Sequence, residues 1–265
     1  MNQLGYYVFA ASTALMLGGV AISLADIREQ YLRWEVHDEE RPLPPVVDPG
    51  HPGTQDDAGK APSDAIVLFD GESTDALVKA NGEPIGWRIT EDGALSTVPR
   101  TGNIQSKQSF GDIQLHVEWR TPPSQAQRGG QGRGNSGIFL MGKYEIQVLD
   151  NKDNDTYADG MAGSIYGQRP PMVNPGRGIN QWQTYDIIWR APRFDDRGNL
   201  VEPAYVTVLH NGVLVQNHTE VLGPSRHKAR TQYTAHQAKL PIVFQNHGEE
   251  AHYRNIWVRE LPPED

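Results

Sequence analysis

The chain has no cysteine among its 265 residues. Disulfides, thiolate catalysis and cysteine-based zinc sites are therefore excluded. Positive charge is also scarce, because 24 Lys and Arg stand against 33 Asp and Glu and give a formal net charge of -9. No nucleic-acid partner is expected, since binding a phosphate backbone requires clustered Lys and Arg.

Long helical patterns are scarce too, whereas glycine and proline are frequent, with 27 and 19 copies. This composition is typical of a β-rich fold with many turns. A hydrophobic share of 37% is enough for one substantial core, or at most two small ones. We therefore expect one folded domain with appendages.

Residues 1–25 contain no charged side chain, and Gly5 to Ala25 is mostly apolar. Ser23 and Ala25 are small residues at the two positions that determine signal-peptide cleavage, so export is predicted. No Lys or Arg precedes the apolar run, and its length of about 20 residues would also suit a membrane anchor. The predicted location is the periplasm, with the protein either released there or attached to the membrane through residues 1–25.

Residues 26–63 are predicted to be a linker. Residues 26–40 are charged and suit a short helix, while six prolines follow between Arg41 and Pro62. Prolines that alternate with Gly, Asp and His favour an extended chain without a packed element. The folded domain is then expected over residues 64–262.

Short strand candidates separated by turn signals fill this domain. The run from Asp112 to Arg120 alternates apolar and polar residues with a period of two, as a half-buried strand does. Asn211-Gly212 lies between two apolar runs and is a strong hairpin signal. Many short strands predict an all-β sandwich or jelly roll. The candidates are residues 65–69, 86–90, 94–98, 104–106, 113–119, 136–141, 144–149, 184–190, 204–209, 213–217, 242–246 and 253–260.

The strand candidate at 144–149 carries the main candidate chemistry. Glu145 and Gln147 are two residues apart, so a strand points both to one face and points Tyr144, Ile146 and Val148 into a core. Laminarinase-type retaining glycosidases place acidic residues at three alternate positions of such a strand. Only the first is acidic here, and double displacement needs two carboxyl groups. A solvated surface carboxylate is the alternative interpretation of Glu145.

Polar segments on either side of this strand extend the candidate site. Asn135, in the glycine-flanked turn before it, and Tyr166, some twenty residues after it, are candidate substrate-binding residues. The acidic run from Asp150 to Asp159 could hold Ca²⁺ or a similar divalent cation, although it departs from the EF-hand pattern at Thr156 and Ala162. A solvated acidic loop is the alternative, and no metal ligand is assigned.

His247 lies at the end of an apolar run, two residues after Gln245. An imidazole is the natural proton shuttle near neutral pH, so His247 is a candidate catalytic residue and Gln245 a candidate binding residue. A structural or exposed histidine is the alternative. Arg254 could bind a sugar hydroxyl or an oxyanion, or form a rim salt bridge. Trp182 is the tryptophan expected to be accessible for stacking on a sugar, because Gln181 and Gln183 flank it.

Five segments in this order resemble the bacterial 3-keto-disaccharide hydrolase domain. The resemblance spans Ala65 to Leu261 and implies a concanavalin-like jelly-roll sandwich of two antiparallel sheets in exported enzymes that act on 3-keto-glycosides. One departure is Asn246, which stands where the family usually has Asp before His247. The segments are GNSGIFLMGKYEIQVLDN (134–151), YADGMAGSIYGQRPP (157–171), QWQTYDIIWRAPRF (181–194), PAYVTVLHNGVLVQ (203–216) and VFQNHGEEAHYRNIWVREL (243–261).

The implied substrate accounts for the missing second carboxylate. A ketone at C3 acidifies the C2 proton, so the glycosidic bond can break by β-elimination, and water can add afterwards. Glu145 and His247 are then expected to transfer protons, in an order that the sequence leaves open, while Gln147, Arg254 or a divalent cation polarises the sugar. A non-catalytic, lectin-like carbohydrate-binding module and a structural envelope protein are the alternatives.

Overall fold

The structure is a computed structural model that describes residues 41 and 43–262. The chain divides into two compact units, and the second comprises Val47–Pro263. The described residues of the first unit, 41 and 43–46, lie in no helix or strand. The predicted signal or anchor segment at 1–25 and the helix at 26–40 lie outside the described residues. Within the described part of the chain, no helix has the length and apolar character needed to span a membrane.

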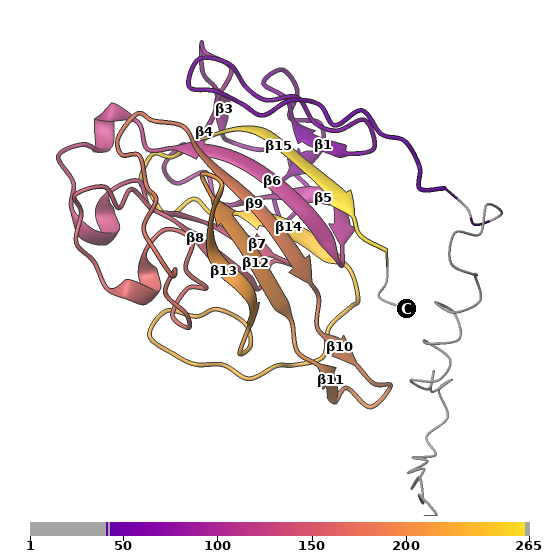
Figure 1. Cartoon of the computed structure of the whole chain (residues 1–265). Helices are drawn as coiled ribbons and strands as arrows, with labels where there is room; N and C mark the ends of the chain where they lie inside the picture. The colour runs from indigo at the N-terminus through magenta and orange to yellow at the C-terminus, as the bar shows by residue number, and fades with distance from the viewer. Residues whose placement is uncertain (1–40, 42, 263–265) are drawn as a thin grey trace, which may run out of the picture. The chain divides into compact units, whose positions relative to one another are not determined.

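Two antiparallel sheets make up the second unit, and an all-β sandwich is thereby confirmed (Figure 1). The larger sheet has the order β13 (Val213–Glu220), β12 (Tyr205–His210), β9 (Gln183–Arg190), β6 (Ile113–Arg120), β15 (His252–Glu260), β4 (Leu95–Ser96) and β3 (Arg88–Ile89), with β1 (Ile66–Phe69) also paired to β15. The smaller has the order β2 (Leu77–Val78), β5 (Ile104–Phe110), β14 (Leu240–Phe244), β7 (Ser136–Leu140) and β8 (Tyr144–Val148).

The remaining elements are short. β10 (Arg193–Phe194) and β11 (Leu200–Glu202) form a separate hairpin, and three 3₁₀ turns occur at η1 (Pro123–Gln125), η2 (Gly130–Gly132) and η3 (Ala158–Gly160). The hairpin signal at Asn211-Gly212 is confirmed, because these residues join β12 to β13. Both have a positive φ, of 53° and 77°, as a type I′ turn requires.

The core lies between the two sheets and follows from the period-two alternation of their strands. Val117 of β6 and Val148 of β8 are fully buried, as their apolar positions predict. Aromatic rings fill the space between the sheets. The ring centroids of Tyr144 and of Trp189 in the opposite sheet are 5.1 Å apart, and Trp119 packs edge-on against Tyr185. β8 is thus fixed by its core face, and its other face is left to carry polar groups.

Residues 47–62, which we call the strap, pack against the larger sheet (Figure 1, indigo). His51 and Lys60 pair through their backbones, and the side chain of Gln55 forms two hydrogen bonds with the backbone of Trp182, of 2.7 and 2.9 Å. The backbone carbonyl of Asp57 accepts a hydrogen bond from Arg254, at 3.1 Å. Residues 47–62 were expected to be an extended linker without packing, but in the structure they are bound to the larger sheet. Side chains of the sheet form hydrogen bonds with the backbone of this proline-rich segment.

The strap covers a buried charged network on β6 and β15. Glu118 is 1% exposed and accepts hydrogen bonds from Arg254 Nε at 2.7 Å, Asn255 Nδ2 at 2.8 Å and the backbone of Gly59 at 3.1 Å. Burial alone would raise the pKa of Glu118, but His116, Asn255 and Arg254 outweigh it and lower the pKa to about 2. The polar face of β6 is therefore enclosed rather than solvated.

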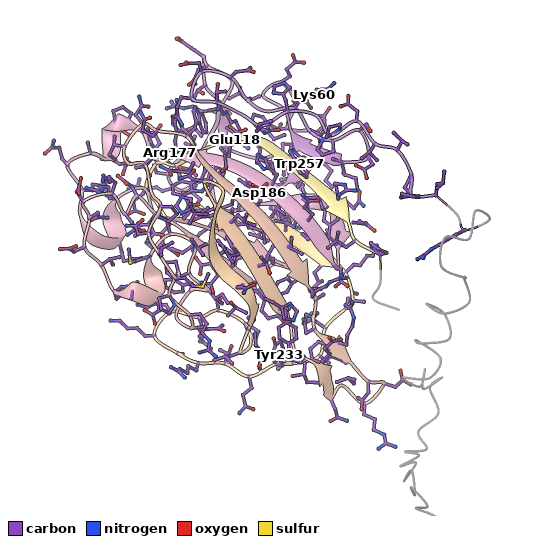
Figure 2. The ribbon with its side chains drawn as sticks, in the orientation of Figure 1. Lys60, Glu118, Arg177, Asp186, Tyr233 and Trp257 are labelled. Atoms are coloured by element: carbon purple, nitrogen blue, oxygen red, sulfur yellow. The ribbon has the colours of Figure 1, made fainter. Side chains whose placement is uncertain are left out.

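His116 adds a second charge to this network. It stacks on Trp257 with ring centroids 5.0 Å apart, and Figure 2 shows Glu118, Trp257 and Asp186 on adjacent strands. Burial alone would lower the pKa of His116, but Asp186 at 2.7 Å and Glu118 at 3.7 Å raise it to about 9. His116 is therefore an imidazolium at neutral pH.

Replacing His116 with asparagine is expected to remove a pH-dependent part of the stability. Because the pKa is raised by folding from 6.5 to about 9, this contribution is complete below pH 6.5 and is lost as the pH rises to 9. The difference in free energy of unfolding between wild type and His116→Asn should shrink by roughly 2 to 3 kcal/mol across that range. Urea titrations at pH 6 and 9.5 measure it, and a pH-independent difference would contradict the assignment.

Candidate active site

A cavity of about 400 Å³ lies on the outer face of the smaller sheet, near its β8 edge. Six of the eight residues predicted from the sequence line it, although they come from separate parts of the chain. They are Asn135, Glu145, Gln147, Tyr166, Gln245 and His247. The fold therefore brings the β7–β8 hairpin, the loop after it and the end of β14 to one place.

The β7–β8 hairpin sets the position of Glu145. Phe139 lies opposite Glu145 and Gly137 opposite Gln147, so the two polar side chains leave the sheet on the face away from the core. Gly137 leaves the space that the carboxyl group occupies, because a Cβ atom at this position would lie 2.3 Å from Glu145 Oε1. Beyond β8, the backbone of Tyr166 donates to the carbonyl of Glu145 at 3.1 Å. The backbone of Glu145 is thus held by β7 on one side and by the segment at Tyr166 on the other.

Glu145 is the buried acid of the cavity. Its residue is 5% exposed, and burial raises the pKa of its carboxyl group to about 8. In the described part of the chain, no cation or hydrogen bond stabilises the ionised form. At neutral pH Glu145 therefore holds its proton, which is the state of a general acid rather than of a nucleophile.

Two amides beside Glu145 have acceptor atoms without partners. Gln147 Nε2 donates a hydrogen bond to Asn135 Oδ1 at 3.1 Å, so the other amide atom, Gln147 Oε1, takes no part in this contact. Gln147 Oε1 and Gln245 Oε1 are buried and have no hydrogen-bond partner among the described residues. Buried amide oxygens without partners are costly, and hydroxyl or amide donors of a bound ligand would satisfy them.

His247 is oriented by a carboxylate that the sequence analysis did not consider. His247 Nδ1 lies 2.7 Å from Glu249 Oε2, so Nε2 is the nitrogen that can exchange a proton with a ligand. Asn246 instead supports the neighbouring loop, because its amide donates to the carbonyl of Val98 at 2.6 Å and to Thr101 Oγ1 at 3.2 Å. The departure from the family's usual Asp therefore leaves the imidazole with a carboxylate partner.

Trp182 and Arg254 do not line the cavity. Trp182 is 3% exposed, so the prediction that it is the accessible tryptophan is wrong. Its ring packs under the guanidinium of Arg254, 4.1 Å away, and Arg254 is bonded to Glu118 beneath the strap. The flanking glutamines suggested exposure, but Gln55 of the strap and the side chain of Arg177 bind the backbone of Trp182 instead.

Four further residues line the cavity and were missed: Phe139, Ser225, Arg226 and His227. Ser225 connects their loop to β8, because its backbone donates to Lys143 at 2.8 Å and its hydroxyl accepts from the backbone of Glu145 at 3.0 Å. One sequence signal was present, namely the basic run from Arg226 to Arg230 in an acidic chain. Its position at the cavity depends on tertiary contacts.

Residues of the acidic run at 150–159 form contacts that hold neighbouring loops together. Asp150 pairs with Arg133 at 3.1 Å, and Asn154 bonds the backbone of Gly130 in both directions. Over the residues that the structure describes, no group of three or more His, Cys, Asp or Glu is arranged to hold a metal. A divalent cation stays a prediction from the sequence.

Changing Gly137 to alanine is expected to displace the carboxyl group of Glu145. The added methyl would overlap Oε1, and a misplacement of about 1 Å in an active site costs on the order of a hundredfold in rate. The rate of glycoside cleavage measures the loss. Gly129→Ala is the matched control, since a Cβ there meets nothing within 4 Å. Equal rates for the two variants would show that the Glu145 position does not matter.

Comparisons with known proteins agree with this architecture. The model of a 3-keto-alpha-glucoside-1,2-lyase-like domain matches residues 64–259. A candidate glycosyl hydrolase from Parabacteroides distasonis, solved as a crystal structure, is 43% identical, with 83% of this chain and 93% of that chain covered and a TM-score of 0.79. A second candidate glycosyl hydrolase from the same organism is 19% identical, with 75% and 94% covered and a TM-score of 0.52, and is similar in fold alone.

The comparison with curated proteins found no match. The family and the 43% identical relative support a hydrolase-like enzyme with a carbohydrate ligand. The family match spans both sheets and all six residues that line the cavity as predicted. By this match, the chain belongs to the 3-keto-alpha-glucoside-1,2-lyase-like domain family.

Proposed function

We propose that this protein cleaves the glycosidic bond of 3-keto-glycosides, including 3-keto-disaccharides, by elimination followed by addition of water. One observation carries the proposal: among the described residues that line the cavity, Glu145 is the only carboxylate. A retaining glycosidase needs two carboxyl groups about 5 Å apart, and an inverting one needs two that flank a water. A reaction that needs one acid, one base and a ketone in the substrate fits this cavity better.

The proposed base is His247 and the proposed acid is Glu145. His247 Nε2 takes the C2 proton, which the C3 ketone has acidified, while Glu249 stabilises the imidazolium through Nδ1. The electrons of the C2–H bond form the C1=C2 double bond as the C1–O bond breaks, and Glu145 gives its proton to the departing oxygen. The pKa of about 8 keeps that proton in place at neutral pH.

Water completes the reaction and resets both groups. Its oxygen bonds to C1 while one of its protons passes to Glu145, and C2 regains a proton from His247. The sum of the two stages is hydrolysis, with no covalent bond between sugar and protein. Gln147 and Gln245, whose amide oxygens lack donors, are proposed to bind the sugar hydroxyls, with Asn135 and Tyr166 beside them.

Deuterium incorporation tests this route. Cleavage of a 3-keto-glucoside in D₂O should place deuterium at C2 of the released 3-keto sugar, and the parent glucoside with a C3 hydroxyl should remain intact. Released 3-keto sugar kept in D₂O without protein corrects for spontaneous exchange. Cleavage of the parent glucoside at a similar rate would refute the proposal, because a C3 hydroxyl does not acidify the C2 proton as a ketone does. Binding without cleavage would favour the carbohydrate-binding module.

Export is part of the proposed setting. It is supported only by the apolar sequence of residues 1–25, which would lead the domain to the periplasm, either cleaved or as an anchor. Fractionation of cells that express the full chain, with an antibody to the folded domain, measures this directly. Recovery of the protein in the cytoplasmic fraction would contradict it.

A further inference from the structure

A second cavity of about 370 Å³ adjoins the catalytic one. Tyr166, Arg226 and His227 line both, so the two form one continuous binding region. Glu145 belongs to the first cavity alone, and Tyr157 and Asp159 to the second alone. A disaccharide with its cleaved bond at Glu145 would therefore extend its other sugar into the second cavity.

The second cavity is basic in a protein whose net charge is -9. Arg226, Lys228 and Arg230 line it, whereas Asp159 is the only carboxylate that does so among the described residues. These three cations are exposed, and none forms an ion pair within the described part of the chain. Cations gathered along a concave surface attract anions more strongly than the same charges dispersed over a protein.

The basic loop is held in place from both ends. Ser225 is bonded to β8, as described above. At the other end, Tyr233, labelled at the lower edge of Figure 2, donates to the carbonyl of Val221 at 2.5 Å and accepts from the backbone of Ala204 at 2.9 Å. The backbone that carries the three cations is thus fixed at the edge of the second cavity.

Two aromatic hydroxyls also line the second cavity. Tyr157 and Tyr166 share a hydrogen bond of 3.0 Å between their hydroxyls, and Tyr166 also bonds His227 Nδ1 at 3.0 Å. Tyr157 is 45% exposed, which leaves its ring available for stacking on a sugar. A cavity lined by both tyrosines and cations suits a sugar ring that carries a negative charge.

We infer that the second cavity binds the leaving group of the substrate, and that this leaving group is a sugar bearing an anionic substituent, either a carboxylate or a sulfate or phosphate ester. The inference rests on the proposed function, because it takes Glu145 as the point of cleavage. Lys228 and Arg230, which line only the second cavity, contact the anion, and Tyr157 stacks on the ring.

Matched substrates test the inference. The 3-keto-glucosides of glucose, of glucuronate and of glucose 6-sulfate differ only in the leaving group. At low salt KM should be about tenfold lower for the charged substrates than for the neutral one, and the preference should fall to about twofold in roughly 0.3 M NaCl. The two anionic substrates distinguish a carboxylate from a sulfate ester. Equal KM values for all three would overturn the inference.

The double variant Lys228→Gln/Arg230→Gln, which leaves Arg226 in place, should lower the preference for charged substrates from about tenfold to about twofold. Lys107→Gln/Arg197→Gln removes the same two kinds of charge from exposed positions outside both cavities, and it should keep the preference. A preference that stays at about tenfold in the first pair would also overturn the inference. Calorimetric binding of the unoxidised disaccharides makes the same comparison without cleavage, so failure of the proposed reaction and failure of the anion site give different results.

Discussion

Replacing Glu145 with glutamine is expected to reduce cleavage of a 3-keto-disaccharide by about a thousandfold, within the range that general acids contribute. Glutamine keeps the shape and buried position of the side chain, but it cannot give a proton to the departing oxygen. Substrate binding should change little, so the loss should appear in kcat. Release of reducing sugar under saturating substrate measures it.

Two comparisons make the Glu145→Gln result decisive. Glu220→Gln alters an exposed carboxylate at the end of β13 and should leave the rate unchanged. The wild-type rate should also fall as the pH rises through about 8, where Glu145 loses its proton. Full activity of Glu145→Gln would show that another group supplies the proton.

The same substitution should stabilise the fold at high pH. Because the folded pKa of Glu145 lies above its ordinary 4.5, the unfolded chain releases the proton first, and stability falls as the pH rises from 4.5 to about 8. Glutamine removes this cost, which is roughly 4 kcal/mol above pH 8 and absent below pH 4.5. A variant that is more stable yet inactive is the expected signature of a carboxyl group held for chemistry.

Replacing Arg254 with methionine is expected to destabilise the protein by about 3 to 5 kcal/mol, because it leaves the buried Glu118 without its guanidinium partner at 2.7 Å. The variant also loses the contact with the Trp182 ring and the bond to the carbonyl of Asp57. Urea unfolding at neutral pH gives the free energy of unfolding. Proteolysis within the strap should accelerate as its anchors are lost.

Arg259→Met is the matched control on the same strand. Arg259 pairs with Asp64 at 2.7 Å, but both side chains are about one-third exposed, and such surface pairs contribute about 1 kcal/mol or less. Adding Glu118→Gln to Arg254→Met should recover part of the lost stability, since the buried carboxylate that lost its guanidinium partner is then gone. Equal losses in the free energy of unfolding for Arg254→Met and Arg259→Met would mean that burial does not strengthen the Arg254–Glu118 pair.

The sequence predicted the strands of the sandwich wherever apolar alternation was strong. Each proposed strand overlaps one in the structure, and the alternation in β6 and β8 identified the core side chains correctly. The strands β2, β10 and β11 were not predicted; β3 and β4 are as short, but they lie inside the longer candidates 86–90 and 94–98. Their pairing depends on neighbours distant in the chain.

The site was predicted in part, and the failures have a common cause. Residues on a predicted strand or at its end, such as Glu145, Gln147 and Gln245, were placed by local geometry alone. Trp182 and Arg254 were misplaced because the same local pattern fits either face of a sandwich, and only the strap decides which one is covered. Arg226 was missed because its loop reaches the cavity through Ser225, a contact that no spacing reveals.

The strap belongs to the folded domain although it precedes the family match. The family match begins at residue 64, whereas the compact unit begins at Val47. A chain trimmed to the family boundary would keep the whole catalytic cavity, yet it would open Glu118 and Arg254 to water on the opposite face of the sandwich. Recombinant forms of this domain should therefore begin at or before Val47, so that the strap still covers Glu118 and Arg254.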